Sequence, residues 1–288
     1  MEQWIKAGKI GAEILSYAKT KAKPGISLLE LAQLIEKKTA DLKAKPAFPI
    51  NLSLNHMAAH YTPLKDDKLI LKEEDILKID LGVHIGGYIS DTALTIGPNK
   101  ELIKASEEAL KEAIKFACPG IELRKIGAVV QNVISSYNFA PIKNLSGHQI
   151  KQYDLHAGLT IPNYDNGNTT KLEEGMIIAI EPFATTGKGK ITEGKPASIY
   201  RFIQNKPVRD ATTKKILNYI EKEYSTLPFA KRWLQEKFPT ANFALRNLEN
   251  QGAIKQYTQL PEESKGLVSQ AEHTILVKDK PIVLTRRD

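Results

Sequence analysis

The 288-residue sequence predicts an α+β fold, in which helices pack beside largely antiparallel strands. Three observations support this class. Two segments near the N-terminus have apolar residues at helical spacing, a glycine-centred β-hairpin follows them, and a second pair of helical segments precedes further apolar strands. The order of two helices followed by strands with acidic residues therefore occurs twice, and we interpret it as a weak internal duplication.

The first half of the chain begins with two amphipathic segments. Residues 2–22 carry apolar side chains at helical spacing, and Pro24 ends this helix. Ser27 begins a capping-box pattern, which predicts a second helix over Leu28–Leu42. An extended or irregular segment, residues 46–63, then leads towards the hairpin.

Residues 78–93 are typical of a β-hairpin that carries two aspartates. With its loop centred on Ile85 and Gly86, Asp80 and Asp91 lie directly opposite each other, with Cβ atoms about 4.5–5.5 Å apart. Two carboxylates this close on an apolar hairpin repel each other unless a divalent cation binds between them. A solvated hairpin face is the alternative, because pairs of Asp are common on such faces.

The second half repeats the pattern. Residues 100–117 and 122–137 have helical spacing, and a buried strand over 176–180 ends at Glu181. A last hairpin is predicted over residues 271–285, with Glu272 at its start and a turn before Pro281.

A basic segment lies between these strands. Residues 198–257 hold eleven Lys or Arg against five Asp or Glu, while the whole chain has a formal net charge of +8. Three short helices are predicted there, over 213–224, 229–238 and 243–250. Such a module favours polyanions such as RNA, although a solvated lysine-rich surface explains the charge equally well.

Composition and length exclude several classes. The apolar and charged fractions, 42% and 26%, are those of an ordinary globular protein. No window approaches 18 uninterrupted apolar residues and the N-terminus lacks the apolar core of a signal peptide, so we expect no membrane partner. Cys118 is the single cysteine and cannot form an internal disulfide, which favours a reducing compartment and a cytoplasmic location.

Acidic residues and one histidine recur in or at the ends of apolar runs. An unpaired carboxylate is costly in such places, and several of them together indicate a shared cation. The candidate ligands are Asp80, Asp91, His148, Glu181 and Glu272. This oxygen-rich set suits Mn²⁺, Fe²⁺ or Co²⁺, with Zn²⁺ or Ni²⁺ as further options, and four carboxylates balance the charge of two divalent ions.

The chain resembles the methionine aminopeptidases, metallopeptidases with the pita-bread fold, and among them the short archaeal form of type 2. The motifs that carry this resemblance are Ala47-Phe48-Pro49, Ser53-Leu54-Asn55, Ala58-Ala59-His60-Tyr61-Thr62-Pro63, Asp80-Leu81-Gly82, Ser90-Asp91-Thr92-Ala93, Gly147-His148, Leu155-His156-Ala157-Gly158, Ile180-Glu181-Pro182-Phe183-Ala184-Thr185 and Glu272-His273-Thr274. The resemblance implies a pita-bread catalytic domain with a pseudo-twofold repeat, formed by residues 1–194 and 259–288. Residues 195–258 are similar to the small helical insertion of type 2.

The resemblance also implies ligand roles for two metal ions. Asp80 binds one ion, Asp91 and Glu272 bridge both, and His148 and Glu181 complete the other. A water molecule made acidic by the ions attacks the first peptide bond, and Glu181 carries a proton to the leaving amine.

Other residues are implied to bind the substrate. His60 and His156 contact the substrate amide and the tetrahedral intermediate, and Phe48 and Leu155 line the pocket for the methionine side chain. No organic cofactor is expected. The resemblance gives no role to His56, His84 and His273, and we predict that His84, beside the hairpin turn, faces solvent.

The implied activity is removal of the initiator methionine from nascent chains whose second residue is small. We expect a monomer that binds nascent N-termini, has no specific DNA partner and is compatible with ribosome association. Two alternatives stay open: an Xaa-Pro aminopeptidase or prolidase, which normally carries an extra N-terminal domain, and a non-catalytic ribosome- or RNA-binding member of the same fold. Metal-dependent release of methionine separates the latter from an enzyme.

Overall fold

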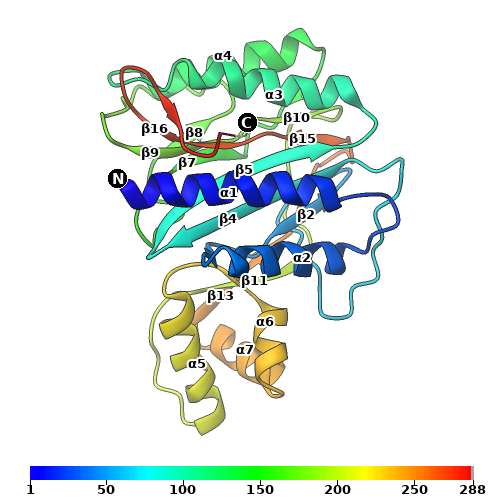
Figure 1. Ribbon diagram of the computed structural model, residues 1–288, viewed down its shortest axis with the longest axis vertical. Helices are drawn as coiled ribbons and strands as arrows, with labels where there is room; N and C mark the ends of the chain where they lie inside the picture. Colours follow the sequence, from blue (N-terminus) through cyan, green and yellow to red (C-terminus); the bar gives the residue numbers. More distant parts are fainter. Residues whose placement is uncertain (287–288) are drawn as a thin grey trace.

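The computed structural model describes residues 1–286, and the predicted domain boundary at residue 288 lies outside them. Two halves, each with a pair of helices over antiparallel sheet, lie one above the other, and a smaller unit projects below them (Figure 1). This order of elements confirms the predicted α+β class and its repeated arrangement. None of the helices in the described residues is long and apolar enough to cross a membrane.

The first half packs two helices on a four-stranded sheet. Its elements are α1 (Glu2–Lys21), α2 (Leu28–Asp41), β1 (Lys45–Pro46), β2 (Asn51–Leu54), β4 (Leu77–Ile85) and β5 (Tyr88–Ile96). The capping prediction is confirmed, since the Ser27 hydroxyl accepts a hydrogen bond from the Glu30 amide at 3.0 Å. Ile14 and Leu15 of α1 and Leu31 of α2 are fully buried against apolar side chains of β4.

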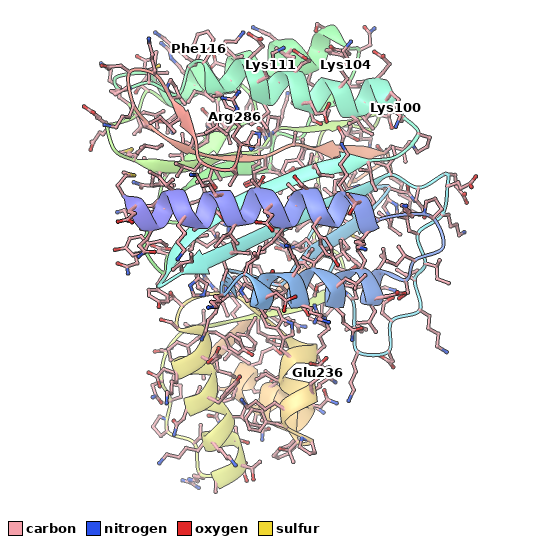
Figure 2. The ribbon with its side chains drawn as sticks, in the orientation of Figure 1. Lys100, Lys104, Lys111, Phe116, Glu236 and Arg286 are labelled. Atoms are coloured by element: carbon pink, nitrogen blue, oxygen red, sulfur yellow. The ribbon has the colours of Figure 1, made fainter. Side chains whose placement is uncertain are left out.

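The second half has the same plan. Its helices are α3 (Lys100–Ile114) and α4 (Leu123–Ser136), and its strands are β6 (Ala140–Pro141), β7 (Ser146–Ile150), β8 (Thr160–Pro162), β9 (Ile177–Ile180), β10 (Phe183–Thr185), β15 (Val268–Gln270), β16 (His273–Leu276) and β17 (Ile282–Val283). They form a five-stranded sheet in the order β17-β16-β9-β7-β8 and a smaller sheet, β15-β10-β6. Lys100, Lys104 and Lys111 of α3 lie on the outside of the molecule (Figure 2), so the opposite face of this amphipathic helix is buried.

The two halves meet where β5 lies beside β16. A β-bridge joins Ala93 to Glu272, and the Asp91 amide donates to the Thr274 hydroxyl at 2.7 Å. The same hydroxyl donates to the Asp91 carbonyl at 2.7 Å. Strands from both halves are thereby held edge to edge at the centre of the molecule.

The hairpin has a different register from the predicted one. Its loop is Gly86-Gly87, with φ of +58° and +85°, and Ile85 pairs with Tyr88. Two successive glycines accept the two positive φ values of a tight two-residue turn, which shifts the loop by one residue. Asp80 therefore lies opposite Ala93, and Asp91 opposite Gly82. The prediction that the aspartates are directly opposed is wrong, and they are diagonal neighbours on one face.

The prediction that His84 faces solvent is also wrong. Only 6% of His84 is exposed, because the Tyr153 ring lies against it with centroids 5.7 Å apart. The Gly87 amide donates to His84 Nδ1 at 3.0 Å, so this nitrogen carries no proton. Burial, followed by the charge of Lys45, lowers the pKa of His84 to about 4, while the charge of Glu223 opposes this shift.

The basic segment contains a small β-sheet in addition to the predicted helices. The predicted helices are present as α5 (Ala211–Tyr224), α6 (Lys231–Lys237) and α7 (Ala241–Asn250), and they pack on a sheet of β11 (Pro196–Phe202), β12 (Phe229–Ala230) and β13 (Ile254–Thr258). The sequence analysis missed these strands, because proline, serine and charged residues obscure their alternation. We propose that residues 195–258 form a subdomain, and the separate hydrophobic cluster of these elements supports the proposal.

A buried ion pair connects this segment to the first half. Arg232 of α6 donates from both terminal nitrogens to the Glu36 carboxylate of α2, and from Nε to the Pro63 carbonyl at 3.2 Å. Trp233 Nε1 donates to the same carboxylate at 2.8 Å. The Arg232 side chain is 1% exposed, so its charge depends on Glu36 for compensation.

Glu36→Ala is therefore expected to destabilise the protein by about 3–5 kcal/mol, because it leaves a buried guanidinium without a counter-charge. Chemical denaturation measures the change in free energy of unfolding. Lys37→Ala, an exposed position on the same helix, is the control and should change it by about 0.5 kcal/mol or less. The double variant Glu36→Ala/Arg232→Met should recover part of the loss. Equal stability of Glu36→Ala and wild type would contradict a compensating role for Glu36.

His84 is expected to make stability depend on pH. Its folded-state pKa of about 4 lies below the ordinary 6.5, so between these values the unfolded chain binds the proton and the folded chain does not. The free energy of unfolding should therefore fall as the pH decreases from 6.5 to 4. His84→Gln removes this contribution, so the fall between pH 7.5 and 5 should be smaller in the variant. An identical pH slope in both proteins would contradict the buried, neutral state of His84.

Candidate metal centre

The five predicted ligands come from strands of both halves. Asp80 is on β4, Asp91 on β5 and His148 on β7. Glu181 directly follows β9, and Glu272 directly precedes β16. The contact between β5 and β16 brings the first sheet against the second, so residues nearly 200 positions apart reach one place.

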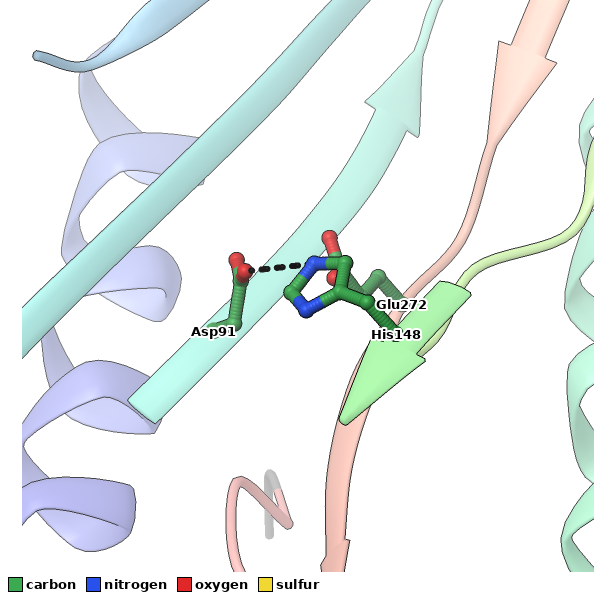
Figure 3. Close-up of side chains that lie close together, drawn as sticks. All are labelled: Asp91, His148 and Glu272. Atoms are coloured by element: carbon green, nitrogen blue, oxygen red, sulfur yellow. Dashed lines mark ion pairs between the residues drawn. The ribbon is translucent and has the colours of Figure 1, made fainter. Parts of the chain in front are cut away.

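Distances between side chains show the convergence. One ligand atom each from Asp91, His148 and Glu272 lies within 4.8 Å of the other two (Figure 3). His148 Nε2 is 3.5 Å from Asp91 Oδ2 and 3.5 Å from Glu181 Oε1. Gln270 Nε2 donates to Asp80 Oδ2 at 3.3 Å and to Glu272 Oε2 at 3.4 Å, which connects Asp80 to the same cluster.

The carboxylates are buried beside one another. Burial raises the pKa of Asp80 to about 7, although the Gln270 hydrogen bond opposes the shift. Burial and the charge of Asp80 raise the pKa of Asp91 well above its ordinary value. Burial and the charge of Asp91 do the same for Glu181 and Glu272. Each carboxylate thus makes ionisation of its neighbours less favourable.

The donor set fits a divalent cation. Within residues 1–286, none of these four carboxylates forms an ion pair with a Lys or Arg. The buried oxygens Asp80 Oδ1, Asp91 Oδ1 and Glu272 Oε1 also lack a hydrogen-bond partner there. Buried oxygens without donors, together with one imidazole nitrogen, are the ligands that Mn²⁺, Fe²⁺ and Co²⁺ take.

Gln270 is a site residue that the sequence analysis missed. Its amide group lies between Asp80 and Glu272 and holds one oxygen of each. It stands two residues before Glu272, so the period of an extended segment places both side chains on one face. The two-residue spacing from Glu272 could have identified Gln270 as a site residue from the sequence.

Three histidines at the site are neutral at pH 7. Burial, with the charge of His156, lowers the pKa of His148 to about 3. Burial, followed by the charges of His60 and Arg201, lowers that of His156 to about 4. Burial also lowers the pKa of His60. The His148 and His156 rings meet edge to face at 4.4 Å.

The orientation of His60 is defined by its backbone contact. Its Nδ1 lies 3.0 Å from the Thr258 carbonyl oxygen, which can only accept, so the proton is on Nδ1. Nε2 is then left as a hydrogen-bond acceptor. His60 has φ of +64°, an uncommon conformation for a residue with a side chain. Such strain at a buried histidine is typical of a functional position.

A cavity of about 260 Å³ contains all of these groups. Its wall includes the five predicted ligands, together with His60, His156, Phe48 and Leu155. Phe183, Ile199, Pro228, Tyr257 and Leu260 complete the apolar side. Ile199, Pro228 and Tyr257 belong to the 195–258 segment, so this segment forms part of the cavity, which the sequence analysis did not predict.

Gly82 sets the position of Phe48 in this wall. A Cβ atom at Gly82 would lie 2.3 Å from Phe48 Cε1, far inside van der Waals contact. The absence of a side chain therefore allows the aromatic ring to lie against β4, beside Asp80. His56 and His273 lie outside the cavity wall. The His273 ring instead contacts the Thr285 hydroxyl at 2.9 Å.

Comparison with known proteins agrees with this geometry. The sequence model of metallopeptidase family M24 matches residues 2–279. The methionine aminopeptidase of Pyrococcus abyssi is 49% identical over 99% of this chain and 99% of its own length.

Two solved structures share the fold. The methionine aminopeptidase of Rickettsia prowazekii superposes with a TM-score of 0.71 at 25% identity, covering 98% of this chain and 95% of its own. A thermophilic Arx1 superposes with a TM-score of 0.84 at 18% identity, covering 98% and 90%. The chain therefore belongs to metallopeptidase family M24, and within it to the methionine aminopeptidases.

Proposed function

We propose that this protein removes the N-terminal methionine from polypeptides whose second residue is small, in a metal-dependent hydrolysis. The observation that carries the proposal is the convergence of five buried ligand side chains in one cavity with neutral histidines and an apolar wall. The name of the 49% identical Pyrococcus abyssi relative supports the same activity.

We propose that Asp80, Asp91, His148, Glu181 and Glu272 hold two divalent ions, of Co²⁺, Mn²⁺ or Fe²⁺, with Zn²⁺ or Ni²⁺ as alternatives. Four carboxylates balance the charge of two such ions. When bound, the ions would make a water molecule acidic and polarise the scissile carbonyl group. The mutual repulsion of the carboxylates is then replaced by attraction to the ions, which supports occupancy of this site.

The remaining chemistry is assigned to side chains of this chain. Glu181 has a raised pKa, a property that suits a group which takes up a proton and returns it to the leaving amine. His60 presents Nε2 as an acceptor, suited to the amide hydrogen of the scissile bond. His156 is neutral at pH 7 and its ring contacts that of His148. It can therefore form a hydrogen bond to the substrate without placing a positive charge beside the metal ions.

The cavity supports selection of methionine. Its volume of about 260 Å³ is below the range of about 300–1,000 Å³ that is usual for drug-sized ligands, so it suits a single side chain. Phe48 and Leu155 give it an apolar surface that matches a flexible thioether. His60, His156 and Tyr257 lie where this cavity adjoins a second one, and we propose that they leave room only for a small second residue.

We further propose that the substrates are the N-termini of newly made chains and that the protein is a cytoplasmic monomer. Residence in the compartment of protein synthesis agrees with its one, free cysteine, Cys118. Contact of the basic 195–258 segment with the ribosome stays a prediction.

A non-catalytic binding protein is the main competing function. The likeness to Arx1, at 18% identity, concerns the fold alone. The retention of all five ligand side chains and both substrate histidines in one cavity favours an enzyme. A prolidase-like activity is less consistent with the full-length match to a methionine aminopeptidase.

Asp91→Asn is expected to lower metal-dependent release of methionine from Met-Ala-Ser by more than about 100-fold, because changes around metal ligands alone cost about 10–100-fold. Calorimetric titration with Mn²⁺ should show weaker binding. The fold should persist, since an amide removes one of the repelling buried charges. Asp279→Asn, an exposed position, is the matched control and should behave as wild type. Unchanged turnover in Asp91→Asn would refute the metal assignment, and wild-type protein inactive with every metal would refute the function.

Gly82→Ala is expected to push the Phe48 ring from its place on β4 and narrow the cavity. The displaced ring would occupy part of the pocket, so kcat/KM for methionyl peptides should fall by about tenfold, chiefly through KM, which corresponds to about 1.4 kcal/mol of lost binding. In Phe48→Leu/Gly82→Ala the smaller side chain makes room for the new methyl group, and KM should partly recover. Wild-type KM in Gly82→Ala would show that Phe48 does not shape the methionine pocket.

A further inference from the structure

A second cavity of about 340 Å³ adjoins the first. The two share His60, His156, Tyr257 and Leu260, so the space is continuous past the two substrate histidines. The second cavity is otherwise lined by polar residues: Glu193, Arg201, Lys255, Gln256 and Thr258. The character of the wall thus changes from apolar to charged at the two histidines.

Two cations of this wall face each other across a strand pair. Arg201 of β11 is paired with Lys255 of β13 in the antiparallel register. Ile199, two residues before Arg201, and Tyr257, two residues after Lys255, line the first cavity. Tyr257 lines both cavities, so the strand pair of β11 and β13 extends from the methionine pocket to the two cations.

Like charges directly opposed on neighbouring strands are unfavourable unless an anion compensates them. Within residues 1–286, neither Arg201 nor Lys255 forms an ion pair with a carboxylate. Glu193, the one acid of this cavity wall, is exposed and leaves one positive charge in excess. Both cations are exposed, so a passing anion can reach them.

Arg201 also lies close to the reacting groups. Its guanidinium contributes to the lowered pKa of His156, after burial and the charge of His60. It lies near the Tyr257 hydroxyl, where it partly offsets the rise in pKa that burial causes. A substrate that passes the two histidines therefore meets Arg201 next.

We propose that Arg201 and Lys255 form a subsite for an acidic side chain of the substrate, downstream of its second residue. This inference rests on the proposed function. The N-terminal residue occupies the first cavity, where the ligand side chains and the apolar wall lie, and the scissile bond lies at His60 and His156. The second cavity shares both histidines with the first and so offers the chain a path, along which a Glu or Asp side chain meets both cations. The enzyme thereby selects among nascent chains by an acidic residue at the third position.

The test compares three peptides with amidated C-termini, Met-Ala-Glu-Ala, Met-Ala-Gln-Ala and Met-Ala-Lys-Ala, so that the side chain is their only difference in charge. Wild-type kcat/KM should be about three- to tenfold higher for the Glu peptide than for the Gln peptide, the range given by one or two exposed charge pairs. The Lys peptide should be the poorest. The Glu preference should decrease between 0.05 and 0.5 M salt.

Arg201→Gln/Lys255→Gln should bring the Glu to Gln ratio close to one. Arg246→Gln/Lys215→Gln removes the same charges from exposed positions of the same segment and should keep the wild-type ratio. If wild type shows no preference for the Glu peptide over the Gln peptide, the proposal of this subsite is overturned. An equal loss of preference in both double variants also overturns it, because a long-range field would then explain the effect.

A binding measurement separates failure of the subsite from failure of the proposed function. If no methionyl peptide is cleaved, the function fails, and calorimetry with amidated Ala-Glu-Ala and Ala-Gln-Ala judges the subsite alone. Tighter binding of the Glu peptide to wild type than to Arg201→Gln/Lys255→Gln supports it. Equal binding of both peptides to wild type overturns it.

Discussion

The contact between β5 and β16 is the constraint on which the site depends, because it holds together four carboxylates that repel one another. Asp80 and Asp91 come from one half, and Glu181 and Glu272 from the other, so the site exists only because β5 lies against β16. The paired bonds between Asp91 backbone groups and the Thr274 hydroxyl hold these strands together with groups other than the ligand side chains. Sheet pairing thus supplies the energy that brings like charges together, and a cation removes the conflict.

The three histidines of the site are uncharged, so they do not oppose binding of a cation. His148, His156 and His60 have lowered pKa values chiefly through desolvation of their rings, although the His156 residue as a whole is exposed, and none of them adds a positive charge at pH 7 that would repel a cation. The contact of His60 with the Thr258 carbonyl selects one tautomer and ties the histidine to the end of β13. The 195–258 segment therefore orients His60 as well as lining the cavity.

The helices and the five side chains that converge in the cavity could be singled out because their signals are local or specific. The Ser27 cap follows from a four-residue pattern, and the acids stand at the ends of apolar runs. The predicted hairpin loop was displaced by one residue, because Ile85-Gly86 and Gly86-Gly87 both fit the spacing of the flanking strands. His84 could not be predicted as buried, because Tyr153, nearly 70 positions away, covers it. Strands β11 and β13 were missed because proline, serine and charged residues obscure the alternation of apolar side chains in them.

The 195–258 segment contributes both to the stability of the fold and to the wall of the cavity. The ion pair of Arg232 with Glu36 joins it to α2, and the same segment places Ile199, Pro228 and Tyr257 in the wall of the first cavity. A shift of this segment would therefore change the cavity while leaving Asp80, Asp91 and Glu272 in place on the two sheets. The clustered acidic side chains and the part of the cavity wall that this segment provides thus depend on different contacts. The ion pair between Arg232 and Glu36 joins α6 to α2 and lies outside both sheets that carry the cluster.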